Sequence, residues 1–137
     1  MRRYFYRNII TMSYTGINQL GHTHQVWLKS LSFYKDEIRV MRVRLTEVAT
    51  KNSSFEARQG IEHYENQFIV QLETIDELTH SINQYAGDVA KDVQLHAGHI
   101  NELLVGEYEN LEERYQSFEK NFNVLRQDFK GYLAKWM

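Results

Sequence analysis

The sequence of 137 residues contains no cysteine and no proline, and its seven glycines are scattered. Without cysteine there is no disulfide, no thiol nucleophile and no thiolate metal ligand. Because the glycines never cluster and no serine is framed by them, the sequence also lacks the loops that cradle phosphates and the usual setting of a serine nucleophile. The absence of proline leaves nothing that must break a long helix.

An excess of one charge and long hydrophobic runs are lacking as well. Sixteen basic and eighteen acidic residues leave a formal net charge of -2, which gives no general attraction to nucleic acid or to an anionic membrane. No stretch approaches the roughly 18–20 apolar residues of a membrane span, and Arg7 and Asn8 interrupt the apolar start too early for a signal peptide. We expect one cytoplasmic domain, without a cofactor, a nucleic-acid partner or an indicated small-molecule substrate.

The sequence does contain a sustained alternation of three- and four-residue steps between large apolar side chains. Such steps place their members on one stripe of an α-helix, and stripes that persist over several heptads favour long helices packed side by side. The first stripe is His24, Trp27, Leu31, Tyr34, Ile38, Met41, Leu45 and Val48. The second repeats at seven-residue intervals, at Ile61, Phe68, Ile75, Ile82, Val89 and His96, and is flanked by Leu72, Leu78, Tyr85 and Val93. The third is Leu104, Tyr108, Leu111, Tyr115, Phe118, Phe122, Leu125, Phe129, Tyr132 and Trp136.

These stripes predict three helices at about 20–51, 54–95 and 101–136, which form a bundle over 19–137 after a flexible or loosely docked tail at 1–18. Asn52, Ser53 and Ser54 indicate the first turn, and the capping-box spacing from Ser53 to Glu56 makes Ser53 or Ser54 the N-cap. The second turn is placed at Gly98, near residues 95–101, with Gly87 and Gly106 as alternatives.

The predicted fold is therefore all-α, an elongated antiparallel up-down-up three-helix bundle with coiled-coil-like heptad packing. It is similar to spectrin-like and other three-helix bundles, a resemblance of fold that implies nothing about activity. Met12 offers a second possible start, so residues 1–11 are either an extension or a basic, aromatic arm that docks elsewhere.

The predicted core also contains polar groups, which need either hydrogen-bond partners or access to water. Gln71 and Asp92 interrupt the companion line of the second stripe, so we expect one edge of that seam to contact water. Several tyrosines lie on core lines, and each of their hydroxyls needs a hydrogen-bond partner or access to solvent.

A second apolar stripe lies on the side of the first helix that should face solvent. Val26, Phe33 and Val40 recur at seven-residue spacing, and Val43 joins them. Single exposed apolar residues are normal, but a phenylalanine with a valine one heptad away on each side predicts a partner interface. The simplest partner is a second copy of the chain in a homodimer, and the alternative is the N-terminal tail folded over this face. The predicted function is a non-enzymatic interaction protein that self-associates or acts as a scaffold or adaptor.

The alternative function is a metal-binding or redox bundle. Glu77 and His80 have the Glu-x-x-His spacing that di-iron bundles use twice, but the second copy is missing. The antiparallel arrangement would bring His22 and His24 to the height of His80, and would put His96 and His99 near the second turn. His24 also suits a hydrogen-bonded core position. An enzyme with a pocket between subunits is a further possibility, for which no residue can be named.

Overall fold

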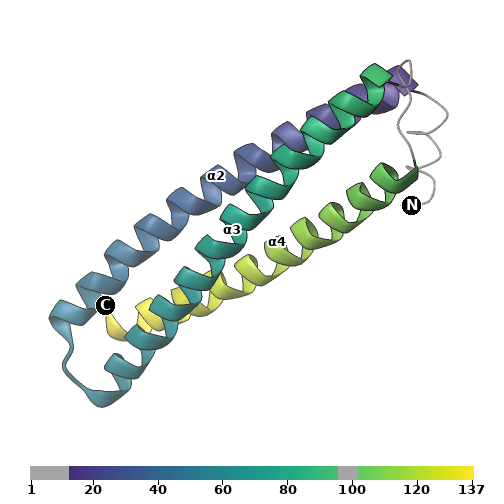
Figure 1. Cartoon of the computed structure of the whole chain (residues 1–137). Helices are drawn as coiled ribbons and strands as arrows, with labels where there is room; N and C mark the ends of the chain where they lie inside the picture. The colour runs from purple at the N-terminus through teal and green to yellow at the C-terminus, as the bar shows by residue number, and fades with distance from the viewer. Residues whose placement is uncertain (1–12, 96–101) are drawn as a thin grey trace. The chain divides into compact units, whose positions relative to one another are not determined.

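The computed structural model describes residues 13–95 and 102–137, which form three α-helices (Figure 1). Helix α2 is Ser13–Lys51, α3 is Phe55–Leu95 and α4 is Glu102–Trp136. The chain is an all-α three-helix bundle, which confirms the predicted fold class. The alternation of helix direction and the coiled-coil-like packing stay predictions.

The chain divides into two compact units, and each helix supplies residues to both. Unit 1 comprises Met1–Ser30 and Glu77–Gln116, whereas unit 2 comprises Leu31–Asp76 and Ser117–Met137. The heptad pattern runs through the boundaries at Ser30, Asp76 and Gln116 without a change of period, so it contains no signal for this division.

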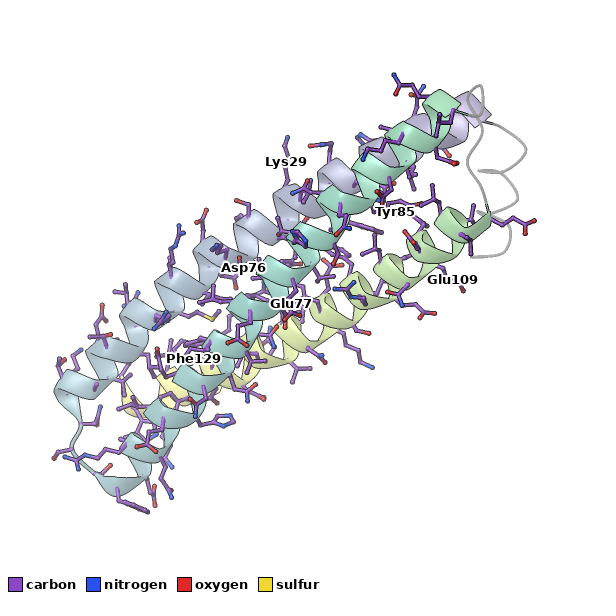
Figure 2. All side chains as sticks on the ribbon, in the orientation of Figure 1. Lys29, Asp76, Glu77, Tyr85, Glu109 and Phe129 are labelled. Atoms are coloured by element: carbon purple, nitrogen blue, oxygen red, sulfur yellow. The ribbon has the colours of Figure 1, made fainter. Side chains whose placement is uncertain are left out.

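Aromatic side chains from all three helices meet in the core of unit 1. The ring of Trp27 stacks on those of Tyr108 and Tyr115, with centroid distances of 5.7 and 5.0 Å. Tyr85 points from α3 towards α4 (Figure 2), and its hydroxyl donates a 2.7 Å hydrogen bond to the carbonyl oxygen of Leu104. Because this bond satisfies the hydroxyl, the tyrosine can be buried without leaving an unpaired polar group.

The core of unit 2 is more strictly apolar. Phe68 of α3 meets Phe129 of α4 edge to face, with ring centroids 5.1 Å apart. The other fully buried side chains of this unit include Leu31, Ile38, Val48, Ile75 and Phe122. Full burial of a large aliphatic or aromatic side chain contributes about 1.5–3 kcal/mol relative to exposure, so the predicted stripes are the main source of stability here.

The helix ends agree with the prediction at every described boundary except the first. Helix α2 begins at Ser13, not near residue 20, because neither a proline nor a glycine pair stops the helix between these positions. Gly87 and Gly106 lie inside α3 and α4, so neither forms the second turn. Gly98, the predicted turn residue, lies outside the described residues, between the observed helix ends at Leu95 and Glu102.

Ser54 is the N-cap of α3. Its Oγ accepts a 3.2 Å hydrogen bond from the backbone N–H of Ala57, while its carbonyl oxygen accepts the first helical bond from Arg58. The third helical position is therefore alanine and not the glutamate of a capping box. Of the two serines predicted as caps, the structure selects the second.

The prediction of a wet edge on α3 is wrong, since Gln71 and Asp92 are both buried. The Oε1 atom of Gln71 lies within the protein without a hydrogen-bond partner. Polar residues on a core line need not reach water when large side chains of the facing helices enclose them, and periodicity alone does not report those neighbours.

Candidate interaction surface

The predicted second stripe is exposed on α2. In unit 2, Phe33 is 67% exposed, Val40 61% and Val43 60%; we call these three residues the α2 surface. Val26, which belongs to unit 1, is 47% exposed. The described residues of each unit therefore leave these side chains largely uncovered, whereas the tail proposed as an alternative cover lies mostly outside the described residues.

Two ion pairs beside the α2 surface join side chains of the same helix. Arg39 contacts Asp36 at 2.9 Å, and Arg44 contacts Glu47 at 3.2 Å, each pair spanning one turn. Such exposed pairs add only a few tenths of a kcal/mol to helix stability.

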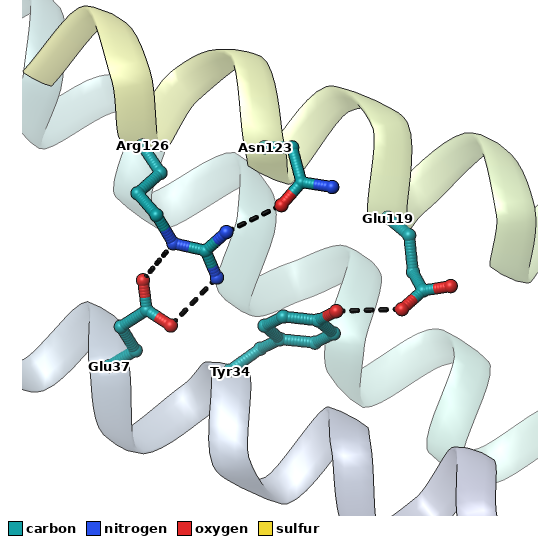
Figure 3. Close-up of polar contacts among 5 residues, drawn as sticks. All are labelled: Tyr34, Glu37, Glu119, Asn123 and Arg126. Atoms are coloured by element: carbon teal, nitrogen blue, oxygen red, sulfur yellow. Dashed lines mark hydrogen bonds and ion pairs between the residues drawn. The ribbon is translucent and has the colours of Figure 1, made fainter.

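Figure 3 shows the polar contacts that join α2 to α4 in unit 2. Arg126 binds both carboxylate oxygens of Glu37, with one of the two contacts at 2.8 Å. The Tyr34 hydroxyl donates a 2.7 Å hydrogen bond to Glu119, and the Arg126 guanidinium also lies 4.9 Å from the centre of the Phe122 ring. The hydrogen bond to Glu37 raises the pKa of Arg126, so this residue stays a cation throughout the ordinary pH range.

These contacts were not predicted from the sequence. Glu37 and Arg126 each flank an apolar stripe, the positions from which charged residues join neighbouring helices of a coiled coil, but the pattern does not say which partners meet. The bidentate pair fixes α2 against α4 within unit 2. Glu37 lies one turn after Phe33, so the pair restrains α2 next to the α2 surface.

Four of the six residues named as candidate metal ligands lie in the part of the chain that the structure describes. His22, His80 and Glu77 are exposed, whereas His24 is only 3% exposed. Among the residues that the structure describes, no group of three or more histidine or acidic side chains is placed to hold a metal ion. His96 and His99 lie outside that part of the chain, so the structure gives no account of them.

His24 instead occupies an aromatic enclosure in the core of unit 1. Its ring centre lies 5.2 Å from that of Tyr85, 5.4 Å from that of Trp27 and 5.7 Å from that of Tyr108. The prediction of a core residue is correct, but the Nε2 atom has no hydrogen-bond partner. Burial lowers the pKa of His24 from 6.5 to about 4, because transfer from water penalises the charged imidazolium.

Two grooves run between α3 and α4, one in each unit. The groove of unit 1 has a volume of about 250 Å³ and is lined by Tyr85 and Leu111 and by charged side chains that include Asp88 and Glu107. Arg114 also lines it, with its guanidinium 3.4 Å from the Ser81 hydroxyl. The charges stand on exposed or half-buried positions of two helices, an arrangement typical of a solvated groove.

The groove of unit 2 is larger, about 500 Å³, and is lined by aromatic side chains. We call it the aromatic groove and define it by Tyr64, Tyr132 and Trp136 together with Gly60 and Gly131. The sequence analysis missed it, since Tyr132 and Trp136 were assigned to the core. The sequence did contain a signal, because Gly60 and Gly131 each lie within a predicted helix, where no turn requires a glycine.

None of the helices that the structure describes is both long and apolar enough to cross a membrane. No model of a known protein family matches the sequence, and neither a curated protein nor a solved structure matches it significantly. A proposal about function therefore depends on the surfaces described above.

Proposed function

We propose that this protein is a non-enzymatic interaction protein that self-associates through the α2 surface. The observation that carries the proposal is the exposure of Phe33, at 67%, one heptad from the similarly exposed Val40. A phenylalanine in that setting leaves most of its ring in water, although the same helix buries every large apolar residue of its core stripe except the half-buried Tyr34.

The free energy available from covering this surface is of the same order as the cost of forming a dimer. Full burial of one such side chain contributes about 1.5–3 kcal/mol, and the three residues of the α2 surface are each about two-thirds exposed. Six side chains from two copies would then contribute roughly 6–12 kcal/mol. Association costs on the order of 4–15 kcal/mol in lost freedom, so we expect a dimer of moderate affinity.

The paired charges around the α2 surface favour a second copy as the partner. In a twofold interface the same patch meets itself, so an unpaired charge close to the axis would face its own like charge. Here Arg39 is paired with Asp36, and Arg44 with Glu47, within each helix. These two pairs reduce the like-charge repulsion that opposes contact between identical surfaces.

The test is sedimentation velocity of the full chain at several concentrations. The double variant Phe33→Glu, Val40→Glu should sediment as a monomer where the wild type is dimeric, because each copy would bury two new carboxylates. Val124→Glu is the matched control, since Val124 is 56% exposed and also belongs to unit 2, but on α4. It should dimerise like the wild type, and a wild type that stays monomeric at every concentration would contradict the proposal.

A further inference from the structure

We infer that two copies of the chain pair through α2 in antiparallel orientation, with Phe33 near the twofold axis and Lys29 of each copy beside Asp36 of the other. This pairing rests on the proposed function, because it specifies how the α2 surface is used. Its orientation and register follow from the order of apolar and charged side chains along the outer side of α2.

Two opposite charges lie in line on the outer side of α2. Lys29 and Asp36 are seven residues apart, which places them on the same face of the helix, and both are exposed. The side chain of Lys29 projects from the outer side of α2 (Figure 2). Phe33 lies between the two charges, four residues after the lysine and three before the aspartate. Because α2 is one continuous helix from Ser13 to Lys51, this order and spacing follow from helix geometry alone.

Both charges can accept a partner from another chain. No residue that the structure describes forms an ion pair with Lys29. Asp36 contacts Arg39 at 2.9 Å, but its side chain is still 65% exposed. A carboxylate has two oxygens and can accept hydrogen bonds from two cations at once. The outer side of α2 therefore offers one unpaired lysine and one aspartate with room for a second cation.

An antiparallel pair brings these side chains into register. At about 1.5 Å per residue, Lys29 lies about 5 Å to one side of the midpoint between residues 32 and 33, and Asp36 lies about 5 Å to the other. A twofold axis at this midpoint places each Lys29 level with Asp36 of the other copy. Val26 and Val40, about 10 and 11 Å from the same midpoint, also come level with each other, and Phe33 meets Phe33 of the other copy. Apolar side chains thus meet apolar ones, and each charge meets its opposite.

Other arrangements of the same face bring like charges together. In a parallel pair each residue faces its own copy, so lysine meets lysine and Asp36 meets Asp36. An antiparallel pair with its axis midway between Phe33 and Val40 places Lys29 level with Arg44 of the other copy. Charges across an interface select orientation and register more than they add affinity, because the wrong arrangements are penalised by repulsion. The antiparallel pair centred beside Phe33 avoids this repulsion.

The test is exchange of the two charges, followed by sedimentation velocity of the full chain. Lys29→Glu and Asp36→Lys should each weaken the dimer at least about fivefold, since each creates two like-charge contacts per dimer. The double variant Lys29→Glu, Asp36→Lys restores opposite charges across the interface and should dimerise within about threefold of the wild type. A double variant no tighter than the single ones would overturn the inference.

The matched control for these variants is Lys120→Glu. Lys120 is an exposed lysine of α4, and its replacement changes the net charge by the same amount as Lys29→Glu. It should dimerise like the wild type, because it lies on a different helix from the proposed contact. Equal weakening by Lys120→Glu and Lys29→Glu would mean that only the net charge matters, which would also overturn the inference.

A disulfide test reports the orientation directly, because the chain has no cysteine of its own. Ser32→Cys places a thiol near the proposed axis, so two copies should be linked readily by oxidised glutathione. Val43→Cys places its thiol about 16 Å from the axis, so the two thiols of an antiparallel pair lie roughly 30 Å apart and cannot be joined. A parallel pair would bring the thiols together in both variants. Equal cross-linking of the two variants would overturn the antiparallel orientation.

Failure of this inference and failure of the proposed function give different results. A wild type that stays monomeric at every concentration removes the proposed function and the antiparallel pair with it. A wild type that dimerises, and loses its dimer in Phe33→Glu, Val40→Glu, keeps the proposed function. If the charge variants of Lys29 and Asp36 then dimerise like the wild type, only the antiparallel arrangement is overturned.

Discussion

At the scale of single residues, His24 makes the strongest prediction, which concerns pH. The pKa of this histidine is about 4 in the folded chain, compared with 6.5 in a model peptide. Below pH 6.5 the unfolded chain therefore takes up a proton that the folded chain does not, and stability falls as the pH falls through this range. At pH 4.5 the loss from His24 alone should be roughly 2–3 kcal/mol. Urea unfolding at pH 7.5 and 4.5 measures it.

The matched variant for this prediction is His24→Phe, which keeps an aromatic ring among Trp27, Tyr85 and Tyr108 but cannot be protonated. Carboxylates titrate in both proteins over the same range, so the difference between the two pH dependences isolates His24. The wild type should lose roughly 2–3 kcal/mol more than the variant between the two pH values. Equal losses would mean that the imidazole accepts a proton in the folded state without penalty.

The sequence could place His24 in the core, because it stands at a core position of an apolar heptad. It could not show that the Nε2 atom lacks a partner, since hydrogen bonds depend on the side chains that two other helices bring close. Arg126 illustrates the same limit. Its flanking position indicates contact with a neighbouring helix, but only the three-dimensional arrangement identifies Glu37 as its partner.

At the scale of whole helices, the glycines allow a paired prediction. Gly60→Ala should destabilise the chain, because the new methyl group overlaps the Tyr132 ring, whereas Gly131→Ala should stabilise it by about 0.5–1 kcal/mol. Both substitutions improve helix propensity equally, so propensity cannot account for opposite signs. Thermal unfolding of the two variants beside the wild type decides the question. A gain in stability for Gly60→Ala would show that the Tyr132 ring is not held against α3.

The positions of the helices were largely predictable, because helix formation depends strongly on local sequence. The burial of individual side chains was only partly predictable. The apolar stripes located α3 and α4 to within a residue at each described end. The start of α2 was missed, because the prediction began the helix at the apolar period, whereas an established helix can extend beyond that period by adding one hydrogen bond per residue. Gln71 was expected at a wet edge and is buried, since its environment depends on residues distant in sequence.

At the scale of the whole molecule, the sequence could predict the apolar stripe on the outer side of α2 but not the aromatic groove. An outward stripe stands out in a periodic pattern, because Phe33 and Val40 occupy positions where polar residues are expected. The groove does not, because Tyr132 and Trp136 continue a core stripe and differ from it only in being half-buried. The division into two units has no counterpart in the heptad pattern either.

Self-association should also make the stability of the molecule depend on protein concentration. If folding and dimer formation are coupled through the α2 surface, mass action stabilises the folded dimer as concentration rises. A hundredfold increase corresponds to about 2.7 kcal/mol per dimer, or ~1.4 kcal/mol per chain. For a chain of this size that should raise the Tm by roughly 4 °C. Differential scanning calorimetry at the two ends of this range measures the shift.

The Phe33→Glu, Val40→Glu variant provides the decisive comparison, because exposed charges on α2 should not disturb the core of unit 2. Its Tm should be the same at both concentrations, while Val124→Glu should retain the shift of the wild type. Aggregation during heating would also produce a dependence on concentration, but it would lower the Tm of all three proteins as concentration rises. A wild-type Tm that does not increase with concentration would contradict self-association through the α2 surface. Phe33 would then remain exposed to solvent in the folded protein.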